Sequence, residues 1–364
     1  MKRKYILIFF IGVVLIMGFL FNFTKDNKLS TEKFIEKWFL NANGTLATNV
    51  LDSDRMDADL VKGREALSET IGLWLIYAVE KQDKQMFEKA YNILLNYFLT
   101  ENGFVSWKLT ETGIVEVTTN ALIDDLRIID ALYRAEKLWN IAGYGKVAEQ
   151  IGTYLTNYNR NGLMLTDYYD QQYQTSSAEI TLSYIDPISL EKMLKQRVLD
   201  KQTYHKMVTV LKEAEKANGF FPKAYHVQNN QYRHDQEVHM IDQGLVAYHQ
   251  ALMGSNNPEF LQFIKTEMMT NGKIAGAYNP ASKKPAVHYE SPAVYGILIW
   301  YCLEINETEL AAKLYKRMTE YRNDNIFSRY YGGYTVDDDG DTHIFDNLVP
   351  LIAEQRLMEH GDKF

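Results

Sequence analysis

The sequence predicts an all-α fold in which helical hairpins close into a double ring, and three observations support this. Apolar residues recur about every 3.6 residues in about twelve segments, the spacing of amphipathic helices. Turn dipeptides such as Asn102-Gly103 and Asn161-Gly162 separate many of them. No Pro- or Ser-rich linker divides the chain. Helices on short connections pack as antiparallel hairpins, and about six hairpins can close into one barrel.

The expected helices cover most of the chain after the first 29 residues. Leu122, Leu126, Ile129 and Tyr133 illustrate their apolar spacing. The segments are 30–42, 66–81, 84–99, 120–140, 143–157, 188–198, 201–217, 237–253, 257–270, 292–305, 307–321 and 343–359.

Several stretches between the helices are rich in aromatic residues and are expected to form short strands or loops. They are Phe104–Leu109, Leu163–Tyr169, Ile180–Ile185 and Phe220–Tyr232. Binding sites usually lie on loops that one end of a rigid scaffold carries, so these stretches are candidates for the rim of a site.

The N-terminus has the pattern of a membrane anchor. Three cations, Lys2–Lys4, precede the uncharged apolar run Tyr5–Phe23, which is long enough to cross a bilayer as a helix. The flanking cations place the short N-terminal end in the cytoplasm. We therefore expect a cytoplasmic stub and single-pass anchor at residues 1–27 and an extracytoplasmic domain at residues 28–364.

A cleaved signal peptide, with secretion of the body, is the main alternative, and a buried helix is a third. The end of the run, Phe19–Phe23, is a poor small-x-small cleavage site. No cysteine lies near it, which disfavours a bacterial lipoprotein. The only cysteine, Cys302, lies in an apolar run and is expected to pack in the core, without a disulfide.

The composition and motifs of the chain disfavour nucleic acid, metal ions and cofactors as ligands. The net charge is −8, and no block of Lys and Arg interleaves with aromatics in the body of the chain, so a nucleic-acid partner is disfavoured. His226, His234 and His239 do not have the spacing of a common metal site, and phosphate-binding Gly-rich loops are absent from the sequence. We expect no metal and no cofactor, and a monomer.

Four carboxylates lie within apolar helical segments: Glu69, Asp124, Asp125 and Asp242. A buried carboxylate is costly unless it is paired or functional. A structural explanation stays open for each, because an acidic residue in the first turn interacts well with the helix dipole, and Arg127 could pair with the Asp pair. Two carboxylates that face one groove are the machinery of glycoside hydrolysis, but sequence spacing does not show that they meet.

These segments resemble glycoside hydrolase family 8. Ser68–Leu73 is similar to the family's Ser-Glu-x-x-x-Gly-Met, in which the Glu is the proton donor, so the resemblance gives Glu69 that role. Ala121–Ile129 is similar to Ala-Ser/Thr-Asp-x-Asp-Leu-x-Ile-Ala. Asp125 falls on the second Asp, and Ile123 falls on the first, which binds the sugar in the cleaved subsite. Either Asp124 or Asp125 then takes that role.

Three later segments continue the resemblance. Leu182–Pro187 is similar to Pro-Ser-Tyr-x-x-Pro, and Ile344–Leu348 to the Tyr-Tyr-Asp-x-x-Leu that opens the last helix. Asp242 stands where the family has Tyr-Asp-Ala-x-Arg-x-Pro, although the Arg and Pro are missing. The resemblance implies an (α/α)6 barrel with short β segments in its loops. It also implies an inverting mechanism, with Asp242 as the base and carboxyls about 6.5–9.5 Å apart.

We therefore expect an endo-acting, inverting glycosidase that cleaves a secreted bacterial polysaccharide, either an exopolysaccharide or a β-1,4-linked glycan, with amino-sugar polymers among the candidates. An inactive carbohydrate-binding or scaffold protein of an export system is the alternative, because the sequence around Asp242 departs from the family; a lyase or epimerase on a similar barrel is a third reading. The candidate platforms for sugar stacking are Trp74, Trp107, Tyr168, Tyr184 and Tyr331, with Tyr169 and Tyr330 beside them.

Overall fold

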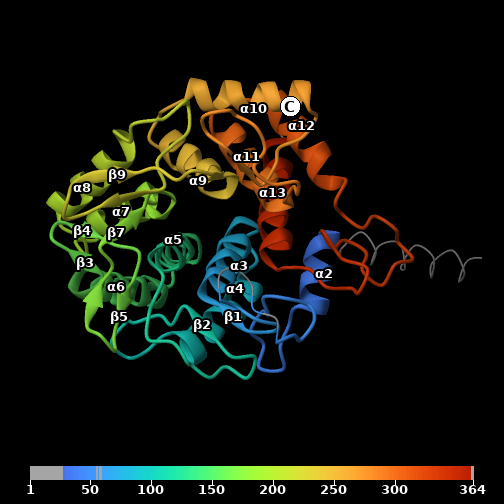
Figure 1. The fold of residues 1–364 in the computed structure, drawn as a ribbon. Coiled ribbons are helices and arrows are strands. Elements are labelled where there is room, and N and C mark those ends of the chain that lie inside the picture. The colour runs from blue at the N-terminus through green and yellow to red at the C-terminus, as the bar shows by residue number, and fades with distance from the viewer. Residues whose placement is uncertain (1–27, 55, 57–59, 362–364) are drawn as a thin grey trace, which may run out of the picture.

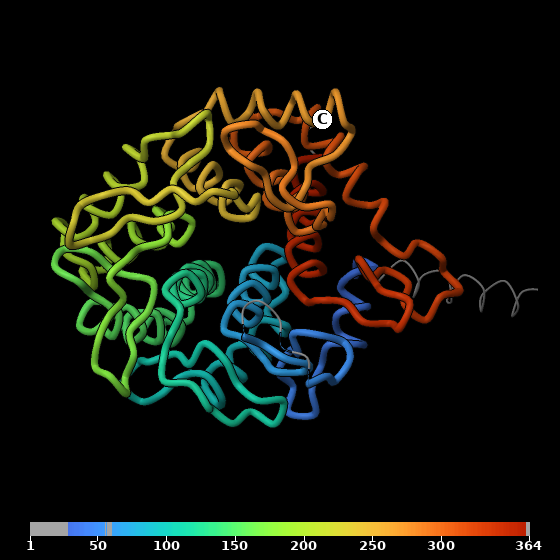
Figure 2. The backbone as a smooth tube through the Cα atoms, in the orientation of Figure 1, coloured from blue at the N-terminus to red at the C-terminus, as the bar shows by residue number. Residues whose placement is uncertain are grey.

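The computed structural model describes residues 28–54, 56 and 60–361, and this part of the chain forms twelve α-helices. The chain passes once around a ring, alternating between an outer and an inner helix (Figures 1 and 2). The outer helices are α2 (Ser30–Trp38), α4 (Lys84–Ile93), α6 (Ala142–Tyr158), α8 (Lys201–Lys212), α10 (Pro258–Thr270) and α12 (Thr308–Thr319). The inner helices are α3 (Ser68–Glu80), α5 (Leu122–Trp139), α7 (Pro187–Lys195), α9 (Met240–Ala251), α11 (Pro292–Glu304) and α13 (Phe345–Gly361).

This arrangement confirms the all-α double ring. The ring closes where α13 packs against α3 and α2, which brings the two ends of the described chain together. The predicted membrane anchor, residues 1–27, lies outside the described residues. Within the described ranges, no helix combines the length and the apolar character needed to cross a membrane.

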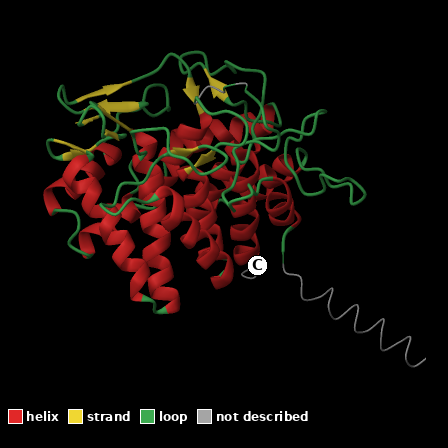
Figure 3. Ribbon diagram, turned by 90° about the horizontal axis from the view of Figure 1, so that it is seen from below, coloured by secondary structure: helices red, strands yellow, loops and turns green. Residues whose placement is uncertain are grey.

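The expected aromatic stretches form short antiparallel strands, and these gather with the long loops at one end of the helices (Figure 3). We call this end the rim. Two-stranded pairs are β1 (Ala66–Leu67) with β2 (Lys108–Leu109), β3 (Arg160–Asn161) with β4 (Met164–Leu165), β5 (Tyr169–Asp170) with β6 (Thr175–Ser176), and β10 (Val238–His239) with β11 (Ala277–Tyr278). A three-stranded sheet consists of β7 (Glu179–Thr181), β8 (Ala224–His226) and β9 (Gln231–Arg233).

Several helices differ from the predicted bounds, and in two of them the local reason is clear. The helix expected at 201–217 ends at Lys212, because the chain then enters a tight turn in which Ala217 pairs with Phe220. Asn218 and Gly219 have positive φ in this turn, which a continuing helix does not allow. The helix expected at 84–99 is α4 followed by a π-helical turn, η1 (Leu94–Phe98), so its direction is kept while its hydrogen bonding changes.

The core is thickest around α11. Every residue from Pro292 to Leu303 is buried, Cys302 included, as expected for a helix that is apolar on all sides. Gly296 lets α13 approach, since a Cβ at this position would stand 2.9 Å from a Val349 side-chain carbon. The interior of the barrel is therefore packed by side chains from neighbouring inner helices, and it holds the rim in a fixed geometry.

Charged residues fill the barrel axis at the end opposite the rim. Arg356 of α13 donates to Glu80 of α3 at 2.8 and 3.2 Å, and Arg134 of α5 donates to the same carboxylate at 3.3 Å. The guanidinium of Arg356 also packs over the Trp300 ring at 4.6 Å. Arg134 and Arg356 line an axial cavity of about 380 Å³. Glu80 thus ties three inner helices together.

Replacing Glu80 with Gln should lower the free energy of unfolding by about 3 kcal/mol, because both guanidinium groups lose their shared countercharge inside the barrel. Urea unfolding followed by circular dichroism measures this change. Glu304→Gln, at the exposed end of α11, is the matched control and should change stability by less than about 0.5 kcal/mol. Equal stabilities of the two variants would contradict the assigned role of Glu80.

Candidate active site

A cavity of about 1040 Å³ opens at the rim, where the N-terminal ends of the inner helices meet. Its lining includes Glu69 at the start of α3, Asp124 at the start of α5, Asp242 at the start of α9 and Asp346 at the start of α13. Each carboxyl lies in the first turn of its helix, where the dipole favours negative charge. The dipole explanation and the functional explanation of these residues are therefore compatible. We call this cavity the cleft.

One guanidinium joins the first two carboxyls. Nη1 of Arg127 donates to Oε1 of Glu69 at 3.0 Å and lies 3.4 Å from Oδ1 of Asp124. The hydroxyl of Ser68 donates to the other oxygen of Asp124 at 2.7 Å. Glu69 keeps 29% of its side-chain surface accessible, whereas Asp124 keeps 8%. All three residues line the cleft, and Glu69 is the more accessible of the two carboxyls that Arg127 joins.

Desolvation raises the pKa of Glu69 above its ordinary value, against the opposing charge of Arg127, and the neighbouring charge of Asp124 raises it further. Burial likewise raises the pKa of Asp124, with Arg127 and the Ser68 hydrogen bond opposing the shift. Two carboxyls that share one cation at the edge of a cavity favour holding a proton between them. A protonated, accessible Glu69 is suited to act as a general acid.

The close approach of α3 and α5 makes this contact possible. At Gly72 an added Cβ would already touch the Arg127 Cβ at 3.4 Å and the Asp124 carbonyl oxygen at 3.5 Å. A larger side chain at position 72 would push α5 away. The glycine in the Ser68–Leu73 motif thus sets the spacing of Glu69, Asp124 and Arg127.

Asp242 has a different environment. The hydroxyl of Ser183 donates to Oδ1 at 2.6 Å, and the ammonium of Lys223 forms an ion pair with Oδ2. The side chain keeps 18% of its surface accessible. Fixed donors to both oxygens orient this carboxylate and satisfy its charge, and each oxygen has a further lone pair with which to accept a proton. A carboxylate placed in this way can serve as a general base.

Two further ionisable groups line the cleft near these carboxyls. Burial raises the pKa of Asp167 to about 6, although its oxygens accept hydrogen bonds from the backbone N–H and the hydroxyl of Thr181 at 2.6 and 2.8 Å. Burial also raises the pKa of the Tyr184 phenol, and the charges of Asp124, Asp167, Glu69 and Asp242 add to this. Tyr184 thus remains a neutral hydroxyl among four carboxyls.

Asp125 lies outside the cleft, although it follows Asp124 directly. It is 1% exposed, and the Asn120 amide donates to its Oδ2 at 2.7 Å. Burial raises its pKa well above the ordinary value. Asn120 lines the cleft, and its own oxygen accepts from the Tyr169 backbone N–H at 2.7 Å. Asp125 supports the cleft wall from behind, and Asp124 occupies the position that faces the cavity.

The structure brings three of the five predicted stacking residues into the cleft: Trp107, Tyr168 and Tyr184. Trp74 lies inside α3, 8% exposed, with its ring 5.5 Å from that of Tyr77, so it is a core residue. Tyr331 lies in the loop between α12 and α13, away from the cleft lining. Tyr169 and Tyr330 pack on other aromatics, against Tyr158 and Trp38 respectively.

Sequence reasoning missed several cleft residues. Lys223 and Tyr289 come from loops without a distinctive pattern, and Asp167 was hidden between two short strands. The one available signal was the sequence Met164-Leu165-Thr166-Asp167, in which an acid directly follows a buried strand. Arg127 was recognised only as a possible partner of the Asp pair, not as the link to Glu69.

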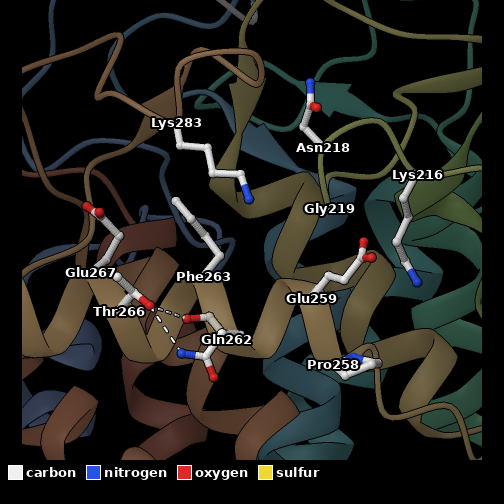
Figure 4. A pocket seen from close by; sticks show the side chains of 10 residues that line it. All are labelled: Lys216, Asn218, Gly219, Pro258, Glu259, Gln262, Phe263, Thr266, Glu267 and Lys283. Atoms are coloured by element: carbon white, nitrogen blue, oxygen red, sulfur yellow. Dashed lines mark hydrogen bonds between the residues drawn. The ribbon is translucent and has the colours of Figure 1, made fainter.

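A second cavity, of about 790 Å³, lies on α10 and contains none of the predicted site residues (Figure 4). Its two carboxylates differ from those of the cleft. Glu267 accepts from the Tyr278 hydroxyl at 2.9 Å and the Asn271 amide at 3.1 Å, so it is engaged in holding local structure. Glu259 is exposed. The cation that two carboxyls share in the first cavity has no counterpart among the residues that line this one.

Comparisons with known proteins agree with the fold. No family model matches the chain. A protein of Bacillus subtilis (strain 168) named "Putative lipoprotein YdaJ" is 35% identical over 331 residues, which are 91% of this chain and 87% of that protein.

The similar solved structures include these three. One described as a novel alpha-amylase from Clostridium perfringens has a TM-score of 0.81 and 26% identity, and covers 90% of this chain and 96% of its own. PssZ from Listeria monocytogenes has a TM-score of 0.72 and 25% identity, with 91% and 97% covered. The endoglucanase Cel10, a family 8 glycosyl hydrolase from Klebsiella pneumoniae, has a TM-score of 0.63 and 14% identity, with 91% and 99% covered.

At 14% identity the Klebsiella structure shows the fold, an (α/α)6 barrel, whereas the Bacillus protein shares sequence along most of both chains. By their names, these similar structures include an alpha-amylase and several endoglucanases. The chain belongs to one family with the Bacillus protein, and its fold is that of glycoside hydrolase family 8.

Proposed function

We propose that this protein is an inverting, endo-acting glycosidase that cleaves a secreted bacterial polysaccharide. The observation that carries the proposal is one cleft lined by two carboxyls in different surroundings. Glu69 has a raised pKa and an accessible side chain, whereas Asp242 is held by Lys223 and Ser183. Glycosidases need one acid and one base of this kind.

In this mechanism Glu69 donates its proton to the glycosidic oxygen as the bond to the anomeric carbon breaks. Asp242 accepts a proton from a water molecule that attacks that carbon from the opposite face. The products are a new reducing end of inverted configuration and a free hydroxyl. Asp124 and Tyr184 line the same cleft and would hold the sugar ring, while Trp107 and Tyr168 offer stacking faces.

The polymer is proposed from the similar proteins. Family 8 endoglucanases act on β-1,4-glucan by their names, and the C. perfringens structure is described as an alpha-amylase. The carboxylates around the cleft favour a neutral or cationic polymer over a polyanion, because a polyanion would meet Asp124, Asp167, Asp170, Asp242 and Asp346. We infer an exopolysaccharide or a β-1,4-linked glycan as the substrate.

We propose that the protein acts outside the cell and is attached to the membrane. The Bacillus relative is named a lipoprotein. In this chain the only cysteine, Cys302, is buried in α11, so an N-terminal cysteine cannot carry a lipid here. The apolar run Tyr5–Phe23 supplies an uncleaved single-pass anchor instead.

Release of reducing ends tests the activity. The full-length protein is incubated with bacterial exopolysaccharides, carboxymethylcellulose, chitosan and starch, and products are sized. Rapid loss of polymer length with a β-linked substrate or an exopolysaccharide supports the proposal. Release from starch alone would assign an α-glucan instead. Binding without release from every polymer would support a carbohydrate-binding protein.

Asp124→Asn should move the alkaline limb of the pH profile of kcat/KM to lower pH. This limb reports loss of the proton from the general acid in the free enzyme. The charge of Asp124 raises the pKa of Glu69, so removing that charge lowers the pKa and Glu69 loses its proton earlier. Asp338→Asn, in an exposed loop, should leave the limb in place. An unmoved or upward-shifted limb in Asp124→Asn would contradict the coupling.

A further inference from the structure

An exposed apolar tip projects from the loop between α12 and α13, residues 320–344. Phe327 is 91% exposed and Ile326 is 69% exposed. This loop extends outward from the barrel beside α2 (Figure 1). Two large adjacent apolar side chains in water contribute nothing to folding, so their position needs another explanation.

The tip is held out by fixed hydrogen bonds. The Phe327 N–H donates to Oδ1 of Asn325 at 3.0 Å, and the Ser328 N–H donates to the Asn325 carbonyl at 2.8 Å. The Asn323 amide donates to the Ser328 hydroxyl at 3.0 Å. A turn closed in this way presents Ile326 and Phe327 to the outside as a preformed feature.

The loop is clamped onto α2 through close backbone contacts. A Cβ at Gly332 would stand 2.4 Å from the Ser30 carbonyl group, and one at Gly333 would stand 2.5 Å from the Phe34 ring. The indole N–H of Trp38 donates to the Arg329 carbonyl at 3.2 Å. The tip therefore has a fixed place relative to α2, the first helix of the described chain.

Aromatic and cationic side chains surround the base of this tip. The Trp38 and Tyr330 rings lie 5.1 Å apart, and the Arg329 guanidinium lies over both, at 5.0 and 4.4 Å. The Lys37 ammonium lies 4.9 Å from the Trp38 ring centroid. The whole chain carries a charge of −8, so this cationic surface is a local feature. Apolar tips, Trp and Tyr rings and cations together are typical of proteins that lie at a membrane interface.

The sequence fixes how far this surface can be from the apolar run. Four residues separate Phe23 from Lys28, and a chain of that length spans at most about 18 Å. Ser30, two residues further on, touches Gly332. If Tyr5–Phe23 is embedded in the membrane, as proposed above, the loop lies near the headgroups.

We propose that Ile326 and Phe327 dock into the outer surface of a bilayer that contains anionic lipid, with Lys37 and Arg329 facing the phosphates. This inference rests on the membrane attachment in the proposed function and adds a second contact to it. A tether and a docked loop together fix the orientation of the barrel, and hence of the cleft, relative to the membrane.

Spin labels at single introduced cysteines test this docking. Cys302 is fully buried, so Phe327→Cys and Met269→Cys each offer one accessible thiol in the full-length protein. Met269 is 82% exposed on α10, in another sector of the ring, and is the matched control (Figure 1). Each labelled protein is reconstituted in vesicles of phosphatidylcholine and phosphatidylglycerol in equal amounts. The ratio of collision with oxygen to collision with a water-soluble nickel complex is then measured.

We expect this ratio to be several-fold higher at position 327 than at position 269, and to fall at position 327 when phosphatidylglycerol is omitted. Equal ratios at the two positions would overturn the docking, as would a label at 327 that loses mobility only when polysaccharide is added. Failure of the protein to sediment with vesicles would overturn both the docking and the attachment. Polymer hydrolysis by the same samples shows separately whether the glycosidase proposal stands.

Discussion

Glu69→Gln should lower reducing-end release by on the order of 1000-fold while the protein stays folded. The amide keeps an oxygen that can accept the hydrogen bond of Arg127, now 3.0 Å from the carboxylate, and it has nearly the same size. It cannot donate a proton as an acid does. The effect should therefore appear in kcat rather than in binding, because the lost interaction acts in the transition state.

Substrates with different leaving groups show whether Glu69 acts as a general acid or has only a structural role. An aryl glycoside with a strongly acidic phenol needs little protonation, so Glu69→Gln should retain far more of the wild-type rate on it than on the natural polymer. Glu88→Gln, on the exposed face of α4, is the control for the substitution itself and should match the wild type. If Glu69→Gln releases reducing ends from the polymer at the wild-type rate, the proposed mechanism is wrong.

Asp242→Asn should reduce turnover by a similar factor, on the order of 100- to 10,000-fold, because no base remains to take the proton of the attacking water. Added azide needs no deprotonation and should restore part of the rate in Asp242→Asn, forming a glycosyl azide of inverted configuration. Nuclear magnetic resonance of the first products identifies their anomeric form.

Several results would contradict this role. Retention of configuration in the wild-type product would exclude Asp242 as an inverting base, and so would a fully active Asp242→Asn. Asp54→Asn, at an exposed position, is the matched control. Thermal unfolding of each variant shows whether loss of the Lys223 ion pair, rather than loss of the base, accounts for the change.

The fold could be predicted from the sequence because the apolar periodicity of a helix is a property of a short segment. The spacing of Leu122, Leu126 and Ile129 predicts one buried face, and α5 indeed buries all three. The ends of the helices are harder to predict from the sequence. The early end of α8 at Lys212 depends on the turn at Asn218-Gly219, whose influence on the preceding residues is not visible in periodicity.

The residues of the cleft could be predicted from the sequence only in part. The notion that Glu69 and Asp242 carry the chemistry came from resemblance, and the structure places both in one cavity. The choice between Asp124 and Asp125 could not be made from the motif. Adjacent residues on a helix point about 100° apart, so a small rotation of α5 decides which one faces the cavity and which one is buried behind Asn120.

The sequence by itself determined that this protein is a ring of helices with acidic first turns, because periodicity and helix-end chemistry are properties of short segments. Tertiary structure alone decided which acids share a cation. Arg127 reaches Glu69 across 58 positions of sequence only because Gly72 lets two helices come close. The tertiary structure likewise places Trp74 in the core and Tyr331 on an outer loop. Whether an aromatic ring contacts solvent, substrate or protein depends on what packs against it.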